Sequence, residues 1–274
     1  MRLSVILSTY NQPAWLEKAL WGFAAQTLTG FEVVIADDGS GPETAALIER
    51  MRAETGLPIR HVWHEDRGFR KCEILNRAVV ASAGDYLVFS DGDCVPRRDF
   101  LAVHARLAEP GRFLSGGYLK LPRLVSERIT PAEIRSGRAF EVDWLREQGW
   151  KPGHRALRLL PPGPAALLDR LTTTRPTWNG HNASAAREAL LRANGYDIDM
   201  GYGGEDRALG ERLQNLGLRG RQIRFRAPCL HLYHERPYVD PAVIRENRRI
   251  RAAIRSERRT RARQGIAELT SDAV

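Results

Sequence analysis

Short apolar runs alternate with longer amphipathic stretches over the first hundred residues of the chain. Four of the runs are rich in β-branched residues and nearly continuous in apolar character: Leu3–Ser8, Glu32–Ala36, Ile59–Trp63 and Asp85–Ser90. Continuous runs, as opposed to strictly alternating ones, are typical of parallel strands that are covered on both faces. The pattern therefore predicts parallel strands at these positions.

The stretches between these runs have helical spacing. After Pro13, a residue tolerated in the first turn of a helix, apolar residues recur at intervals of three and four: Leu16, Ala19, Leu20 and Phe23. A second helix is expected to begin near Pro42, and a third to cover Cys72–Ala81. Strand and helix in repeated alternation predict an α/β fold with a doubly wound, mostly parallel central sheet flanked by helices.

A cluster of polar residues follows each predicted strand. In order, the clusters are Thr9-Tyr10-Asn11, Asp37-Asp38, His64-Glu65-Asp66 and Asp91-Gly92-Asp93. Ligands of doubly wound sheets bind outside the carboxyl ends of the strands. The clusters therefore predict a binding site at this edge of the sheet.

The regular pattern decays between Tyr118 and Pro176, which predicts a long irregular segment that is functional or mobile. The chain becomes regular again in three stretches, interpreted as an ordered segment, a helix and a strand: Trp178–Gly195, Asp206–Leu216 and Gln222–Leu232. A last helix is expected to begin after Asp240-Pro241, with the aspartate as its N-cap.

Composition narrows the class of protein. With 274 residues, 43% of them apolar, the chain can bury a substantial core. Nine arginines against two glutamates between Ala242 and Arg263 give that segment an excess of +7, so only about +2 of the net charge of +9 belongs to the rest. A nucleic-acid-binding surface over the whole domain is therefore not expected.

Three widely spaced cysteines favour a reducing compartment over a disulfide framework. The apolar run at the amino terminus is too short for a signal peptide, and no run approaches the ~20 residues of a membrane span. We expect a cytoplasmic location from these features.

Several polar motifs allow both a structural and a chemical interpretation. Asp91-Gly92-Asp93 is either a polar turn or a site for a hard divalent cation with a bulky anion. Asp37-Asp38-Gly39-Ser40 is either a capping turn or a carboxylate contact to a ribose hydroxyl or a base N–H. Asn11 fits an N-cap, a nucleotide contact or both.

Two later motifs also leave alternatives open. In Gly201-Tyr202-Gly203-Gly204-Glu205-Asp206 the acids are either ordinary first-turn residues of a helix or a carboxylate base presented beside a cleft. His231 and His234 are three residues apart, so in an extended strand their side chains point to opposite faces. Both reach one metal ion only if the chain turns between them; otherwise one is a ligand and the other supports it.

As a set, these motifs resemble a known family. Ser8-Thr9-Tyr10-Asn11, Ala36-Asp37-Asp38-Gly39-Ser40 and Ser90-Asp91-Gly92-Asp93 are similar to the nucleotide-binding half of inverting family 2 glycosyltransferases, which have a GT-A fold. Trp178-Asn179-Gly180-His181-Asn182 and Gly201–Asp206 resemble the carboxyl-terminal module of β-1,4-galactosyltransferases. The resemblance covers about residues 3–120 and 177–236. Residues 118–176 match nothing in that pattern and are expected to determine acceptor specificity.

The resemblance implies a role for each matching residue. Contacts to the nucleoside and diphosphate are implied for Thr9, Tyr10, Asn11, Asp37, Asp38, Asp66, Arg67, Lys71, Asp91 and Gly92. Metal binding is implied for Asp93 and His234, with His231 as a second histidine ligand, and the cofactor would be Mn2+ or Mg2+. Asp206 would be the general base, and the acceptor sugar would contact Glu205, Trp178, Asn179 and Tyr202. Tyr202 replaces the tryptophan usual in the galactosyltransferase module, so donor and acceptor preference do not carry over.

The predicted organisation is a donor-binding half at 1–120, an acceptor-binding and catalytic half of the same domain at 121–236, and a basic helical tail at 237–274. The predicted function is sugar transfer from a nucleotide-sugar donor, most simply a UDP-sugar, to a saccharide or lipid-linked saccharide acceptor in surface polysaccharide synthesis such as lipopolysaccharide or capsule. A non-catalytic nucleotide-sugar binder and a nucleotidylyltransferase are the alternatives. Val243, Ile250 and Ile254 form an apolar stripe in the tail, at 242–263, that fits either peripheral contact with an anionic membrane or a solvated helix.

Overall fold

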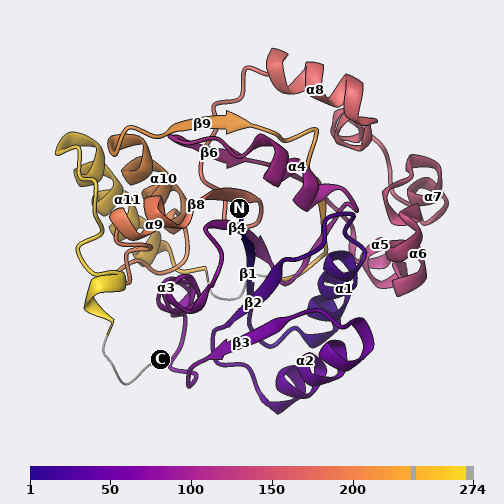
Figure 1. The fold of residues 1–274 in the computed structure, drawn as a ribbon, viewed down its shortest axis with the longest axis horizontal. Helices are drawn as coiled ribbons and strands as arrows, with labels where there is room; N and C mark the ends of the chain where they lie inside the picture. Colours follow the sequence, from indigo (N-terminus) through magenta and orange to yellow (C-terminus); the bar gives the residue numbers. More distant parts are fainter. Residues whose placement is uncertain (236–238, 270–274) are drawn as a thin grey trace.

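A central sheet of seven strands in the order β3-β2-β1-β4-β8-β6-β9 runs through the molecule (Figure 1). Figure 1 shows a computed structural model, which describes residues 1–235 and 239–269. The strands of this sheet are β1 (Leu3–Thr9), β2 (Glu32–Asp37), β3 (Ile59–Trp63), β4 (Tyr86–Asp91), β6 (Arg112–Ser115), β8 (Ala183–Ala186) and β9 (Arg219–Gln222). The first four pair in parallel and β8 is antiparallel to its neighbours, so the predicted mostly parallel sheet is confirmed.

Apolar side chains cover both faces of the sheet, which explains the continuous apolar runs. Val5 and Leu7 of β1 point into a core shared with helices α1 (Pro13–Ala24), α2 (Pro42–Thr55) and α4 (Phe100–Leu107). Ile6 points to the opposite core. That core is formed with α3 (Lys71–Ala81), α9 (Arg187–Arg192), α10 (Glu205–Asn215) and α11 (Pro241–Ser256). The helices predicted near Pro13, Pro42, Cys72 and Asp206 are confirmed within a residue or two.

A second, three-stranded sheet in the order β5-β10-β7 carries part of the site. Its strands are β5 (Cys94–Pro96), β7 (Gly117–Lys120) and β10 (Pro228–His231). The strand predicted at Gln222–Leu232 is confirmed only for Pro228–His231, because the chain leaves the large sheet after β9 and enters the small one at β10. Between them the Ala227 N–H donates to the Ile223 carbonyl at 3.0 Å, which closes a turn.

The segment between residues 118 and 176 is mostly helical, so the predicted irregular structure is wrong. It contains α5 (Arg123–Arg128), α6 (Pro131–Ser136), α7 (Val142–Glu147), α8 (Pro162–Leu171) and the 3-10 helices η1 (Arg138–Phe140) and η2 (His154–Leu159). Helices of six to ten residues complete too few turns for apolar periodicity to stand out. Prolines begin two of them, at Pro131 and Pro162.

The basic helix α11 is docked on the protein. It begins as predicted, with the Asp240 carboxylate accepting from the Ala242 N–H at 2.7 Å. Its apolar stripe does not face solvent: Ile254 is 2% exposed, Ile250 packs against the core beside α10, and Val243 lies against Gly201. The stripe therefore faces the protein, and contact of the tail with a membrane stays a prediction. After α11 the described chain ends with the 3-10 helix η3 (Ile266–Glu268), and no helix within 1–235 and 239–269 is long and apolar enough to cross a membrane.

Candidate active site

A cavity of about 580 Å³ opens at the carboxyl ends of β1 and β4. Most of the predicted site residues line it: Thr9, Tyr10, Asn11, Asp38, Lys71, Asp91, Gly92, Asp93, Tyr202, Glu205, Asp206, His231 and His234. The sequence did not single out some of its other lining side chains as site residues: Ser8, Gln12, Phe69, Tyr118, His181 and Glu235. The predicted residues that do not line it are Asp37, Asp66, Arg67, Trp178 and Asn179. The fold thus brings residues from both halves of the chain into one space.

Asp91 forms an ion pair at the floor of the cavity. Parallel pairing places Ser8 of β1 beside Asp91 of β4, and the Ser8 hydroxyl donates to Asp91 Oδ1 at 2.7 Å. Lys71, the first residue of α3, donates to the same oxygen at 2.9 Å. Burial disfavours the charged carboxylate, but the charges of Lys71 and His181, together with the hydrogen bonds from Ser8 and Lys71, outweigh burial and hold the pKa of Asp91 well below its usual range. One cation and one anion are therefore fixed side by side.

Asp206 and Glu205 open helix α10 on the opposite wall. Burial, and after it the neighbouring Glu205 carboxylate, raises the pKa of Asp206 to about 7, against the opposing charge of Lys71. Gly203 and Gly204, with φ of 109° and 113°, form the turn that leads into the helix. The Gly203 N–H donates to Glu205 Oε2 at 2.7 Å. A carboxyl with a pKa near neutrality can take up and release a proton under physiological conditions.

Buried aromatic residues support the Asp206 carboxylate. Trp178 is fully buried, and its indole N–H donates to the Tyr196 hydroxyl at 2.9 Å. Tyr196, also fully buried, donates to Asp206 Oδ1 at 3.3 Å. A Cβ at Gly180 would lie 2.6 Å from the same oxygen, so the backbone approaches Asp206 too closely for any other residue. Trp178 is thus connected to the site through Tyr196 and does not line the cavity.

Asp93 lies among Cys94 and His231 of the small sheet and His234, which follows it. Asp93 Oδ2 is 3.2 Å from His234 Nε2, and one ligand atom each from Asp93, Cys94 and His231 lies within 4.8 Å of the others. Strand β10 ends at His231, and the chain then turns so that the two histidine rings stack with centroids 5.2 Å apart. The turn required for both histidines to face one site is therefore present.

The donor atoms of this cluster suit a hard divalent cation. Each histidine donates its Nδ1–H to a backbone carbonyl at 2.9 Å, which leaves Nε2 with a free lone pair. Burial, together with Cys229, raises the pKa of the Cys94 thiol well above its usual value, so Cys94 remains a protonated thiol and donates to Asp93. The Nε2 lone pair of His234 faces a carboxylate oxygen of Asp93. Two acceptors at this distance are favourable only when a cation or a proton lies between them. Carboxylate oxygen and imidazole nitrogen are ligands that Mn²⁺ accepts.

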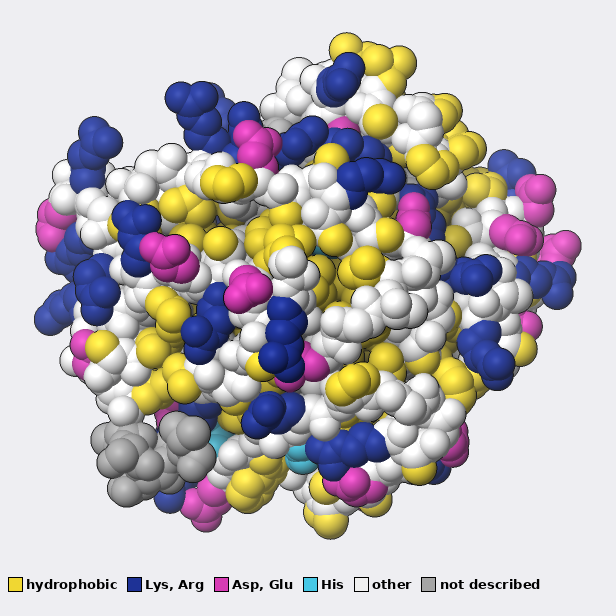
Figure 2. Space-filling model, in the orientation of Figure 1, with side chains coloured by type: hydrophobic (Ala, Val, Ile, Leu, Met, Phe, Trp, Pro, Cys, Tyr) yellow, Lys and Arg dark blue, Asp and Glu magenta, His cyan; other side chains and the backbone are white. Residues whose placement is uncertain are grey.

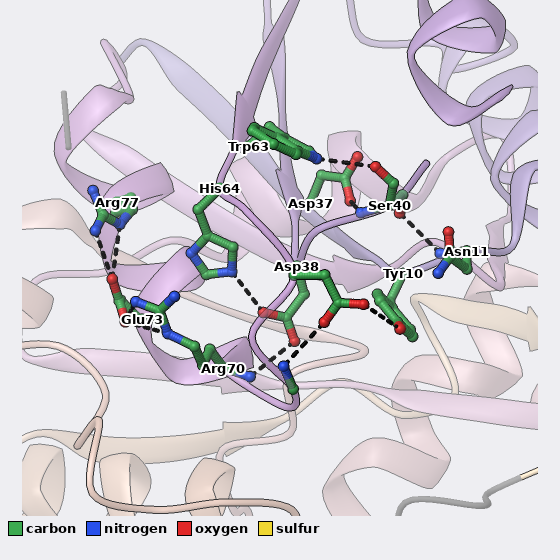
Figure 3. A network of polar contacts seen from close by, with 12 residues as sticks. Tyr10, Asn11, Asp37, Asp38, Ser40, Trp63, His64, Arg70, Glu73 and Arg77 are labelled. Carbon is green, nitrogen blue, oxygen red and sulfur yellow. Dashed lines mark hydrogen bonds and ion pairs between the residues drawn. The ribbon is translucent and has the colours of Figure 1, made fainter. Parts of the chain in front are cut away.

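The side of the cavity next to β2 and β3 contains a network of polar contacts (Figure 3). Asp38, at the end of β2, accepts from His64 Nε2 at 2.8 Å and from the Arg70 backbone N–H at 3.1 Å. Tyr10 donates its hydroxyl to Asp66 at 2.9 Å. Asp37 is fully buried behind this wall, where it accepts from the Ser40 N–H and contacts His61. Asp38 therefore lines the cavity with both carboxylate oxygens held by donors, whereas Asp37 holds the turn.

Two other predicted residues have their polar partners outside the cavity. Arg67 is paired with Glu65 at 2.7 Å in an exposed loop. Asn179 donates to the Ser115 hydroxyl at 3.2 Å. Two residues further along the chain, His181 lines the cavity with its ring edge-on to Tyr118 at 4.7 Å, and burial lowers the pKa of His181 to about 4. His181 belongs to a segment that the resemblance already marked, which is the signal that identifies it.

Comparison with known proteins agrees with this architecture. Residues 4–119 match the family described as glycosyl transferase family 2. Validoxylamine A glucosyltransferase from Streptomyces hygroscopicus subsp. jinggangensis is 31% identical over 235 residues, covering 79% of this chain and 52% of that protein. Chondroitin synthase from Escherichia coli is 26% identical over 259 residues, covering 86% and 35% respectively. The chain thus spans about half the length, or less, of these relatives.

Solved structures show the same fold. The mannosyltransferase PcManGT from Pyrobaculum calidifontis, in complex with GDP-Man and Mn2+, matches with a TM-score of 0.57 at 24% identity, covering 86% of this chain and 58% of that chain. TarS 1-349 from S. aureus, in complex with UDP-GlcNAc, matches with a TM-score of 0.59 at 19% identity, covering 92% and 66%. The predicted GT-A fold is confirmed, and residues 4–119 are similar to glycosyl transferase family 2.

Proposed function

We propose that this protein is an inverting, metal-dependent glycosyltransferase that moves a sugar from a nucleotide-sugar donor to a saccharide acceptor. The observation that carries the proposal is the meeting, in one cavity, of the Asp93 and histidine cluster with Asp206, a carboxyl whose pKa is about 7. A binding protein needs the first group but has no use for a buried, half-ionised carboxylate. The galactosyltransferase-like role of residues 201–206 is part of the same proposal.

Asp206 is the proposed general base. The acceptor hydroxyl loses its proton to Asp206 while its oxygen attacks the anomeric carbon, and the bond from that carbon to the diphosphate breaks with its electron pair leaving on the diphosphate. One displacement inverts the anomeric centre, so an α-linked donor gives a β-linked product. Glu205 orients the acceptor beside Tyr202, which also lines the cavity.

The charged residues on the floor hold the leaving group. Asp93, His234 and His231 would bind Mn²⁺ or Mg²⁺, which when present neutralises charge that develops on the diphosphate. Lys71 is fixed by Asp91 at 2.9 Å, and the negative charges of Asp91, Asp206 and Glu205 overcome burial and raise the pKa of Lys71 well above its usual value. Lys71 therefore stays cationic throughout the reaction and binds the diphosphate electrostatically. Arg67 would have to break its ion pair with Glu65 before it could also contact the diphosphate.

Asp38, Thr9 and Asn11 are proposed to contact the nucleoside, with uridine the expected base. The related chondroitin synthase supports a role in surface polysaccharide synthesis. Thermal shift across UDP-, GDP- and dTDP-sugars with manganese identifies the donor. Release of the nucleoside diphosphate upon addition of acceptor then distinguishes an enzyme from a binding protein, and the absence of release with every donor that binds would refute the proposal.

A further inference from the structure

Helix α8 presents its leucines to solvent and its polar residue to the protein. Ala165 and Asp169, one turn apart, are buried, whereas Leu167 and Leu171, also one turn apart, are 57% and 66% exposed. A surface helix normally has the opposite arrangement, with its apolar stripe on the core. Because α8 turns its apolar side outward, its sequence is suited to something that lies outside the fold.

A buried ion pair fixes this orientation. Asp169 Oδ2 accepts from Arg226 Nε at 2.7 Å, and Oδ1 accepts from the Phe225 N–H at 3.0 Å. The Asp169 side chain is 1% exposed. Rotating α8 to bury its leucines would expel this carboxylate from both partners. The outward direction of Leu167 and Leu171 is therefore built into the fold.

Positive charge surrounds the exposed leucines. The segment from residue 151 to 175 contains five basic residues: Lys151, Arg155, Arg158, Arg170 and Arg175. Its only acid is Asp169, which Arg226 already neutralises, and Leu157 is a third exposed leucine at 46%. Within the described residues 1–235 and 239–269, none of these five basic residues forms an ion pair with an acidic residue. Arg158 instead contacts Tyr118. Figure 2 shows hydrophobic side chains together with Lys and Arg over α8, at the top of the view.

We propose that α8 and η2 form a surface, made of residues 151–175, that binds the anionic headgroup region of a lipid membrane. Figure 1 shows α8 at the outer edge of the molecule, away from the central sheet. Leucines on such a projecting helix, beside unpaired arginines, have the composition of helices that lie in a membrane interface. Basic residues add attraction to anionic lipids. Helix α11 carries more arginines, but its apolar stripe packs on the protein, so α11 lacks the apolar half of this combination.

The surface adjoins the active-site cavity. Arg158 of η2 donates to the Tyr118 carbonyl oxygen and lies over the Tyr118 ring, with its guanidinium carbon 5.6 Å from the centroid. Tyr118 lines the cavity. Membrane binding through α8 would therefore bring the cavity close to acceptors that are carried on lipid.

Co-sedimentation with vesicles tests this proposal independently of any catalytic activity. The protein is expected to bind vesicles of phosphatidylcholine with phosphatidylglycerol and not vesicles of phosphatidylcholine alone. L167D/L171D is expected to weaken binding at least about tenfold, since charged groups replace the inserted leucines. L124D is the matched control, because Leu124 of α5 is 65% exposed and lies outside the surface. Should L167D/L171D not fold, L167S/L171S replaces it.

A second pair of variants separates the contribution of the α8 surface to vesicle binding from that of the arginines of α11. R155E/R170E should reduce binding strongly, and R245E/R248E on α11 should reduce it less. The proposal is overturned if the unmodified protein ignores anionic vesicles, if L167D/L171D binds them normally, or if the α11 pair has the larger effect. It is equally overturned if light scattering shows that Leu167 and Leu171 instead join two copies of the chain.

Discussion

Replacing Asp206 with asparagine should remove activity and at the same time make the protein more stable. A rise in the pKa of Asp206 from its ordinary value of 3.8 to about 7 means that the fold disfavours the ionised carboxylate. About three pKa units correspond to about 4 kcal/mol. Because the unfolded chain gives up this proton near pH 3.8, the cost appears as pH rises above that value, and it is complete above pH 7.

The variant Asp206→Asn never bears this charge, so its advantage should grow with pH. The melting temperature should exceed that of the parent by on the order of 10 °C at pH 8 and by much less at pH 4.5. Transfer should fall about 10²- to 10⁴-fold, the range of a lost general base. Calorimetric melting at both pH values, together with a nucleotide-release assay, measures both effects.

A matched control is Asp143→Asn, since Asp143 has a side chain that is 88% exposed and lies on α7. It should change neither the melting temperature nor the transfer rate. Near-normal turnover by Asp206→Asn would show that another residue takes the proton. A stability gain that is equal at pH 4.5 and pH 8 would refute the link between burial, charge and pKa at this carboxyl.

Other predictions concern the same cavity. Asp93→Ala should abolish the binding of UDP that depends on manganese, and His234→Ala should weaken it about tenfold or more. Calorimetric titration measures this binding. If these variants with manganese and the EDTA-treated parent all bind UDP as well as the manganese-loaded parent does, the metal lies elsewhere. In the parent enzyme kcat/KM should fall about tenfold per pH unit below the pKa of about 7, because Asp206 must be ionised; a flat profile from pH 5 to 8 contradicts this. Tyr196→Phe removes a donor to Asp206 and should move that profile upward by less than about one unit, while leaving the Trp178 N–H unpaired at a cost of about 1–3 kcal/mol; a profile that does not move would show that Tyr196 has only a structural role.

The sequence predicted the first hundred residues of the fold well because local and tertiary signals agree there. Val5, Ile6 and Leu7 are apolar in succession because each faces one of two cores, and the polar residues that follow them are those that reach the cavity. The small sheet could not be predicted in this way. Its strands have three or four residues and come from distant parts of the chain, so no periodic pattern marks them.

Within the site, sequence reasoning placed motifs better than individual side chains. Asp37 and Asp38 are adjacent and equivalent in sequence, yet only the direction of the strand end decides that one is buried and the other lines the cavity. In the same way Trp178 and His181 belong to one marked segment, and the turn between them sends the indole into the core and the imidazole into the cavity. Such choices depend on packing that a linear pattern does not contain.

The docking of α11 has a consequence for the order in which the site is built during synthesis. The fully buried side-chain amide of Asn247 donates to the carbonyls of Gly201, Tyr202 and Gly203, while Val243 and Ile244 pack on the same glycines. These contacts of α11 therefore hold in place the turn that precedes Glu205 and Asp206. A nascent chain acquires the strands β1 to β4 first and lacks this support until its last long helix has emerged. A protein truncated before α11 should retain the residues proposed to bind the nucleotide, but the turn before the proposed base Asp206 should lose its support.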